Sequence, residues 1–217
     1  MEVADFTLMA AGLCFISLSV MLLSAAVKFR PEQASPNGNV ASGIIYAFTA
    51  GMLPGAKESA SRHLMSYTAG IVFHIGIFCA FLFSAAVYLM AKGFIPELPQ
   101  SVRLIVAGLI GLGLVNGVGL LIKRIANSRL RFISTADDYF SNIMVNVFLL
   151  LSIILAVHQT GVIFYTLYIF ETLLLLYIPL GKLRHCAYFF ATRIMFGYFY
   201  GYRGVLPAHN NKGQNER

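Results

Sequence analysis

Charged residues are scarce in this chain. Only 12% of its 217 residues are Asp, Glu, Lys or Arg, whereas 58% are hydrophobic. A water-soluble domain carries about 25% charged residues, so this composition argues against a soluble globular protein. The excess of apolar side chains requires an apolar solvent, which indicates an integral membrane protein.

Cysteine is also rare, with three residues, Cys14, Cys79 and Cys186. Neither a CxxC motif nor a Cys/His cluster is present in the sequence, so disulfides, zinc sites and protein-bound iron–sulfur clusters are not expected. The sequence also lacks a hydrolytic constellation and a nucleotide-binding loop. These absences argue against a stand-alone hydrolase or nucleotide-dependent enzyme.

Five continuous apolar stretches each approach the ~20 residues that cross a bilayer core as a helix. We place them at residues 6–27, 65–90, 104–122, 140–157 and 162–180. Continuous rather than alternating apolar runs favour helices over a β-barrel. The first stretch follows Glu2 and Asp5 instead of a basic segment, so we expect a retained helix and not a signal peptide. The prediction is an all-α, five-helix transmembrane bundle within residues 1–185, followed by an interfacial segment and tail at 186–217.

Basic residues are almost absent from one side of this arrangement. Only Lys92 and Arg103 fall there, so 16 − 2 = 14 of the Lys and Arg residues lie in loop 28–62, in loop 123–131 and after residue 180. The positive-inside rule then predicts an outside N-terminus and a cytosolic C-terminus for a multi-pass protein of the inner (cytoplasmic) membrane. Topology thus explains the net charge of +7, and nucleic-acid binding is not expected.

Glycine and aromatic residues gather in two places. The third apolar stretch contains Gly108, Gly111, Gly113, Gly117 and Gly119, which would let a helix or a flat cofactor approach its backbone closely. Residues after Pro179 alternate aromatic side chains with Arg193 and Arg203, which suits an interfacial helix or a docking surface for a cytosolic subunit. The apolar run 44–48 is expected to lie on the membrane surface or dip into it.

Two histidines belong to the second predicted helix, one just before its apolar stretch and one within it. His63 and His74 are 11 residues apart, so in a helix they differ by about 20° of rotation and about 16 Å of height. Tyr67 and Gly70 share their stripe, and Gly70 leaves room beside His74 for a flat group. His185 is expected at the depth of His63. Neutral imidazoles are good axial ligands for haem iron, although interfacial or hydrogen-bonded histidines are the alternative.

Other ionisable groups are candidates with weaker support. Glu171 is the one acid in the middle of a span and is expected near the level of His74. It is a candidate proton group for a quinone or a partner of an imidazole, and an interhelical hydrogen bond is the equal alternative. Asp137 and Asp138 suit the first turn of the fourth helix as caps. His158 is expected at the membrane interface.

The segments STADDYFSN (134–142) and ETLLLLYIPLGKLRH (171–185), together with the paired histidines of the second span, resemble a known family. They are similar to cytochrome b membrane subunits of the respiratory nitrate reductase gamma type and to the membrane subunit of heterodisulfide reductase. The resemblance implies electron transfer between a membrane quinone (menaquinone or ubiquinone) and cytosolic iron–sulfur subunits through haem b. It implies that His63 pairs with His185, while His74 would belong to an outer haem.

The sequence departs from this pattern at Leu167, where the family has a second histidine in the fifth span. We therefore expect one haem held by His63 and His185, with His74 as a competing ligand, and two haems as the alternative. The chain would then be a subunit of a quinone-linked oxidoreductase. A haem-free membrane anchor that docks a redox partner is a second hypothesis, and a small transporter is a third.

Overall fold

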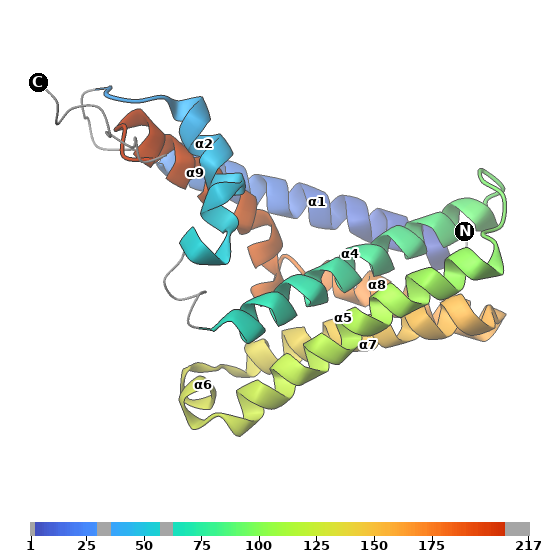
Figure 1. Ribbon diagram of the computed structural model, residues 1–217. Coiled ribbons are helices and arrows are strands. Elements are labelled where there is room, and N and C mark those ends of the chain that lie inside the picture. Colours follow the sequence, from blue (N-terminus) through green and yellow to red (C-terminus); the bar gives the residue numbers. More distant parts are fainter. Residues whose placement is uncertain (1–2, 30–35, 57–62, 207–217) are drawn as a thin grey trace, which may run out of the picture. The chain divides into compact units, whose positions relative to one another are not determined.

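The computed structural model describes residues 3–29, 36–56 and 63–206 (Figure 1). Helices account for most of these ranges, which contain no β-strand. The prediction of an all-α chain is therefore confirmed.

Four helices are long and apolar enough to cross a membrane. They are α1 (Val3–Lys28), α4 (Leu64–Ala91), α5 (Gln100–Ala126) and α7 (Ala136–His158). Each contains the corresponding predicted stretch, because an uninterrupted apolar run has no breaker to end the helix earlier.

The fifth predicted span is shorter than expected. Helix α8 (Gly161–Tyr177) has 17 residues, and after the 3-10 turn η3 (Lys182–Arg184) the chain continues as α9 (His185–Tyr202). The break between the two helices lies around Pro179. At 1.5 Å per residue α8 alone is about 26 Å long, near the lower limit for a span. The structure thus supports four spans, or five with the bent pair taken as one.

The remaining elements are short. They are α2 (Val40–Phe48), the 3-10 turns η1 (Ala50–Met52) and η2 (Pro54–Ala56), and α6 (Ser128–Ile133). Asn127 both ends α5 and caps α6, because its Oδ1 accepts from the backbone N–H groups of Arg129 and Leu130. Asp138 accepts from the N–H of Thr135 at 2.8 Å, which confirms its predicted capping role.

The described residues form two compact units. The bundle unit comprises residues 3–17 and 65–183, and the hairpin unit comprises residues 18–56, 63–64 and 184–206, so α1 contributes to both. The predicted division between residues 1–185 and 186–217 stays a prediction. The fully buried side chains Ile110, Phe148, Leu149 and Leu167 form the core of the bundle unit.

Glycines bring helices of the bundle unit into close contact. A Cβ added at Gly76 of α4 would lie 2.6 Å from the Cα of Gly113 on α5. Gly117, one turn later, lies against Phe73 and Asn146. In contrast, Gly108, Gly111 and Gly119 have open space where a Cβ would go. Helix packing therefore accounts for two of the five glycines predicted to be close-approach positions.

Helix directions alternate within the bundle unit. Asp5 near the start of α1 pairs with Lys92 just after α4, at 2.9 Å. Arg103 near the start of α5 donates to the carbonyl of Ala156 near the end of α7, at 3.3 Å. These contacts place helix starts beside helix ends, as a chain crossing back and forth requires.

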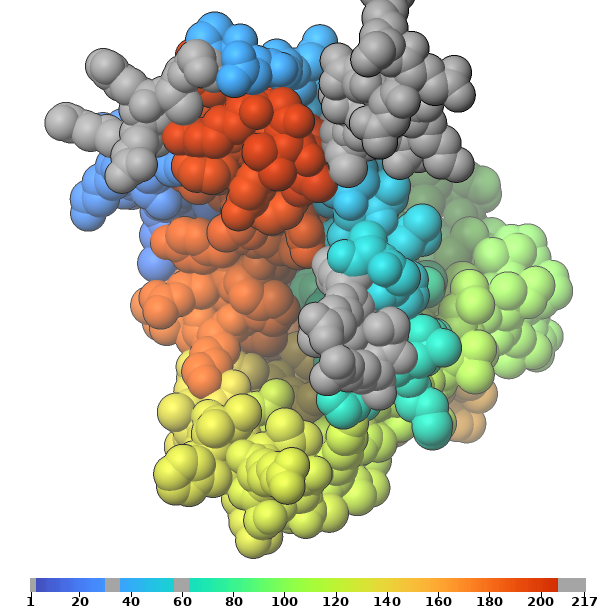
Figure 2. All heavy atoms as spheres, turned by 60° about the vertical axis from the view of Figure 1, so that its left-hand side comes forward, coloured from blue at the N-terminus to red at the C-terminus, as the bar shows by residue number. Residues whose placement is uncertain are grey.

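The hairpin unit is built around the contact of α2 with α9, which lie directly against each other (Figure 2). A Cβ at Gly197 would lie 2.5 Å from the Cα of Ile44, so only glycine permits this approach. The backbone N–H groups of Asn37 and Gly38 both donate to the carbonyl of Tyr202. The apolar run 44–48 thus packs through its helix on α9, which the sequence did not indicate.

Candidate functional site

His74 lies on α4 with its imidazole exposed, about 15 Å along the axis from the start of the helix. Its Nδ1 bonds the carbonyl oxygen of Gly70 at 2.7 Å. A carbonyl oxygen only accepts hydrogen bonds, so Nδ1 carries the proton and Nε2 has the lone pair in the neutral ring. Phe73 contacts the imidazole edge-on, with ring centroids 6.0 Å apart. The hydrogen bond to Gly70 therefore holds the imidazole in this orientation.

Gly70 provides space beside this imidazole. Nothing lies within 4 Å of the point where its Cβ would be. The space at this point is open, and a flat group next to His74 stays a prediction.

His63 and His185 both belong to the hairpin unit. His63 is the turn residue immediately before α4, which begins at Leu64, and His185 is the first residue of α9. Both side chains are exposed. Their pairing around a metal stays a prediction.

Glu171 is buried in the bundle unit, with 5% of its surface exposed. It accepts a hydrogen bond from the hydroxyl of Ser84 on α4. Ser84 is ten residues beyond His74, which corresponds to about 15 Å along the helix. The expectation that Glu171 lies at the level of His74 was therefore wrong, because α8 packs beside the second half of α4.

A polar cluster surrounds this carboxyl group. Tyr168 donates from its hydroxyl to the carbonyl of Ser84 at 2.7 Å. The hydroxyl of Thr7 on α1 donates to the carbonyl of Tyr168 at 3.0 Å and lies 2.8 Å from that of Thr172. This buried polar cluster links α1, α4 and α8. Sequence analysis missed Ser84, Tyr168 and Thr7, since isolated hydroxyls in apolar helices give no signal of their partners.

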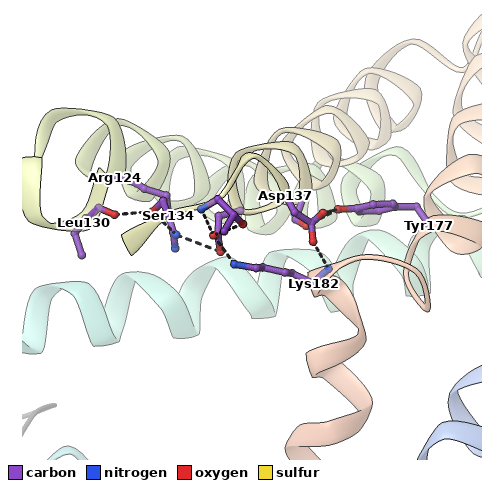
Figure 3. A network of polar contacts seen from close by, with 9 residues as sticks. Arg124, Leu130, Ser134, Asp137, Tyr177 and Lys182 are labelled. Carbon is purple, nitrogen blue, oxygen red and sulfur yellow. Dashed lines mark hydrogen bonds and ion pairs between the residues drawn. The ribbon is translucent and has the colours of Figure 1, made fainter. Parts of the chain in front are cut away.

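A second polar network joins the end of α5 to the start of α7 and to the residues after α8 (Figure 3). Asp138 forms ion pairs with Lys182 and, at 3.4 Å, with Arg124. Asp137 accepts from the hydroxyl of Tyr177 and from the backbone N–H of Lys182. These carboxylates fix the break between α8 and α9 to the start of α7. This is a structural role, in line with the predicted capping.

Leu167 is fully buried in the apolar core of the bundle unit. Position 167 therefore contributes packing where the resembling family has a ligand. His158 is the last residue of α7 and is exposed, at the end of the helix where an interface residue was expected.

A haem and a directly bound metal ion need different sets of protein ligands. Among the described residues, no group of three or more His, Cys, Asp or Glu side chains is close enough to hold an ion. Haem needs only axial ligands, and His74 presents the appropriate tautomer beside open space at Gly70. The residues present thus fit one axial ligand on α4, with His63 and His185 as the other candidates.

Comparison with known proteins adds no relatives. Neither a family model nor a curated protein nor a solved structure matches this chain.

Proposed function

We propose that this chain is a b-type cytochrome subunit of a membrane oxidoreductase complex. It passes electrons between a membrane quinone and a cytosolic iron–sulfur subunit, and it resides in the cytoplasmic membrane with its N-terminus outside. The membrane part of the proposal is supported by several helices that are long and apolar enough to cross a bilayer. The electron-transfer part of the proposal depends on one observation, the orientation of the His74 imidazole.

His74 supports the proposal because of its place in the helix and the orientation of its ring. An exposed imidazole in the middle of an apolar spanning helix is unfavourable in lipid, so such groups have a functional partner by default. The hydrogen bond from Nδ1 to Gly70 directs the basic Nε2 away from the helix backbone. Metal-ligating histidines commonly have this type of support on the other ring nitrogen.

When bound, haem would supply one-electron transfer within the bilayer. The chain's own residues have simpler roles in this proposal. The carbonyl of Gly70 holds the ring of His74, and the missing side chain at Gly70 leaves the adjacent space open. One haem held by His63 and His185, with His74 as a competing ligand, is the arrangement that the sequence predicts.

Glu171 has no assigned part in quinone chemistry in this proposal. Its carboxyl is buried and accepts a hydrogen bond from Ser84, so the structure favours the interhelical alternative.

A haem-free docking subunit is the second candidate. The burial of Leu167 favours it, because an apolar side chain fills the position of an expected ligand. Such a subunit would bind its iron–sulfur partner without carrying electrons itself.

The test is haem content of the complex purified from native membranes. The proposal predicts a dithionite-reducible b-type spectrum and at least one haem per chain by pyridine haemochrome assay. His74→Ala should lower haem content at least twofold, while His158→Ala, an exposed histidine at a helix end, should leave it unchanged. A complex that retains its partners but has no b-type absorption contradicts the proposal and supports the docking subunit.

A further inference from the structure

A cavity of about 330 Å³ lies in the bundle unit where α4 and α7 end and α8 begins. Its volume is within the range of small-molecule sites. Its inner wall includes Phe83 and Leu155, each only 3% exposed, together with Val87 and Phe164. This wall is apolar throughout.

The rim is polar. Glu97, Gln159 and Thr160 line it, and all three are exposed. A cavity with an apolar floor and a polar rim matches a ligand with an apolar tail and a polar head.

The polar rim residues have unused hydrogen-bonding capacity. Thr160 occupies the N-cap position of α8, but its hydroxyl makes no capping bond. Within the part of the chain that the structure describes, the carboxylate of Glu97 has no ion pair or hydrogen bond. These exposed groups are therefore free to bond solvent or the head group of a ligand.

The backbone of Gln159 has an unusual conformation. It has φ 41° and ψ 39°, the left-handed region, and is the one non-glycine residue with positive φ among the described ranges. Glycine or asparagine is usual at such helix ends, and strained backbone concentrates at ligand sites. The strained residue is here part of the cavity lining.

Charge at the rim favours a cation. Glu97 is the only ionisable side chain in the lining. The negative carboxyl ends of α4 and α7 meet the positive amino ends of α5 and α8 here, so the helix dipoles roughly balance and the charge of the rim is that of the Glu97 carboxylate. Of the cations nearby in the fold, Lys92 pairs with Asp5, and the guanidinium of Arg103 is not part of the lining and donates to the carbonyl of Ala156.

We propose that this cavity binds a single-chain amphiphile with a positively charged, hydrogen-bond-donating head group. The tail lies against Phe83 and Leu155, and the head contacts Glu97, Gln159 and Thr160. This site is independent of the haem proposal, because none of its lining residues is a candidate iron ligand. It would take its ligand from the bilayer, near the water interface.

The test uses two photoactivatable probes of equal chain length, an alkylamine and an alkyl carboxylate, each with a diazirine in the tail. The full chain is reconstituted into phosphatidylcholine nanodiscs, and labelled peptides are mapped by mass spectrometry. Normalising to labelled lipid corrects for different partition of the probes. The amine should label peptides containing residues 83–91 and 155–164 at least fivefold more than the carboxylate does.

Three variants sharpen the result. Gly161 lines the cavity and has open space at its Cβ position, so Gly161→Leu should fill the cavity and remove most labelling. Gly108→Leu is the matched control, because Gly108 is equally open but does not line the cavity. Glu97→Gln should abolish the preference for the amine while labelling by both probes persists.

Equal labelling of the unmodified chain by both probes overturns the proposed head-group charge. Labelling that survives Gly161→Leu overturns the site itself. If Gly161→Leu does not fold, the comparison of probes on the unmodified chain and on Glu97→Gln still decides the proposal.

Discussion

The hydroxyl of Ser84 on α4 donates a hydrogen bond to the buried carboxyl of Glu171 on α8. This pair joins two helices through polar groups that the bilayer cannot solvate. It also determines the height at which the two helices meet, because a shift of one turn would leave the carboxyl without its donor.

Removal of this donor should destabilise the chain. Ser84→Ala leaves the Glu171 carboxyl buried without this hydrogen-bond donor, at a cost of about 1–3 kcal/mol. Thermal unfolding in detergent should show a lower midpoint than for the unmodified chain. The control is Ser24→Ala, since Ser24 is exposed and bonds only the carbonyl of Val20 on its own helix. Equal midpoints for the two variants would show that the Ser84–Glu171 bond contributes nothing to stability.

Two glycines on α5 should respond in opposite directions to the same substitution. Gly113→Ala forces a methyl group to within 2.7 Å of the Cα of Gly76, so the helices must separate and stability should fall by about 1–3 kcal/mol. Gly108→Ala meets open space and replaces glycine by the best helix former, which should add up to about 1 kcal/mol. Urea or thermal unfolding of both variants measures the difference. Similar effects from both would contradict the close packing of α4 on α5.

The predicted orientation can be tested with the native cysteines. Cys186 is exposed near the start of α9, whereas Cys14 is buried. A C-terminus in the cytosol predicts that a membrane-impermeant maleimide labels Cys186 in inside-out vesicles and leaves it unlabelled in right-side-out vesicles. Ser101→Cys, near the start of α5, should show the opposite pattern in a chain without the native cysteines. Labelling of both positions from one side would contradict alternating spans.

Much of the fold could be predicted from the sequence. The four long spans follow from apolar runs of sufficient length, because a peptide backbone in lipid must satisfy its hydrogen bonds within the helix. The fifth span was predicted too long. A proline at 179 and a glycine at 181 indicate a break, but the contacts of Asp137 and Asp138 with Lys182 beside it could not be predicted.

The candidate site was predicted only in part. The room beside His74 follows from glycine at position 70, four residues earlier on the same helix. The partner of Glu171 could not be predicted, because a serine at 84 is one of several isolated hydroxyls in apolar helices. Choosing among them requires knowing which faces of α4 and α8 meet.

The amino-acid sequence by itself determined that this chain needs an apolar environment, that it forms helices, and where its four long apolar helices lie. Each follows from local composition, since burial in lipid and hydrogen bonding within a helix need no distant residue. Only the tertiary structure decided that Glu171 bonds Ser84 and does not lie at the level of His74. It also decided that α2 packs on α9 through glycine and that a cavity forms beside Gln159. These features depend on which helix faces come together, and that choice is made by the complementary shapes of side chains far apart in the chain.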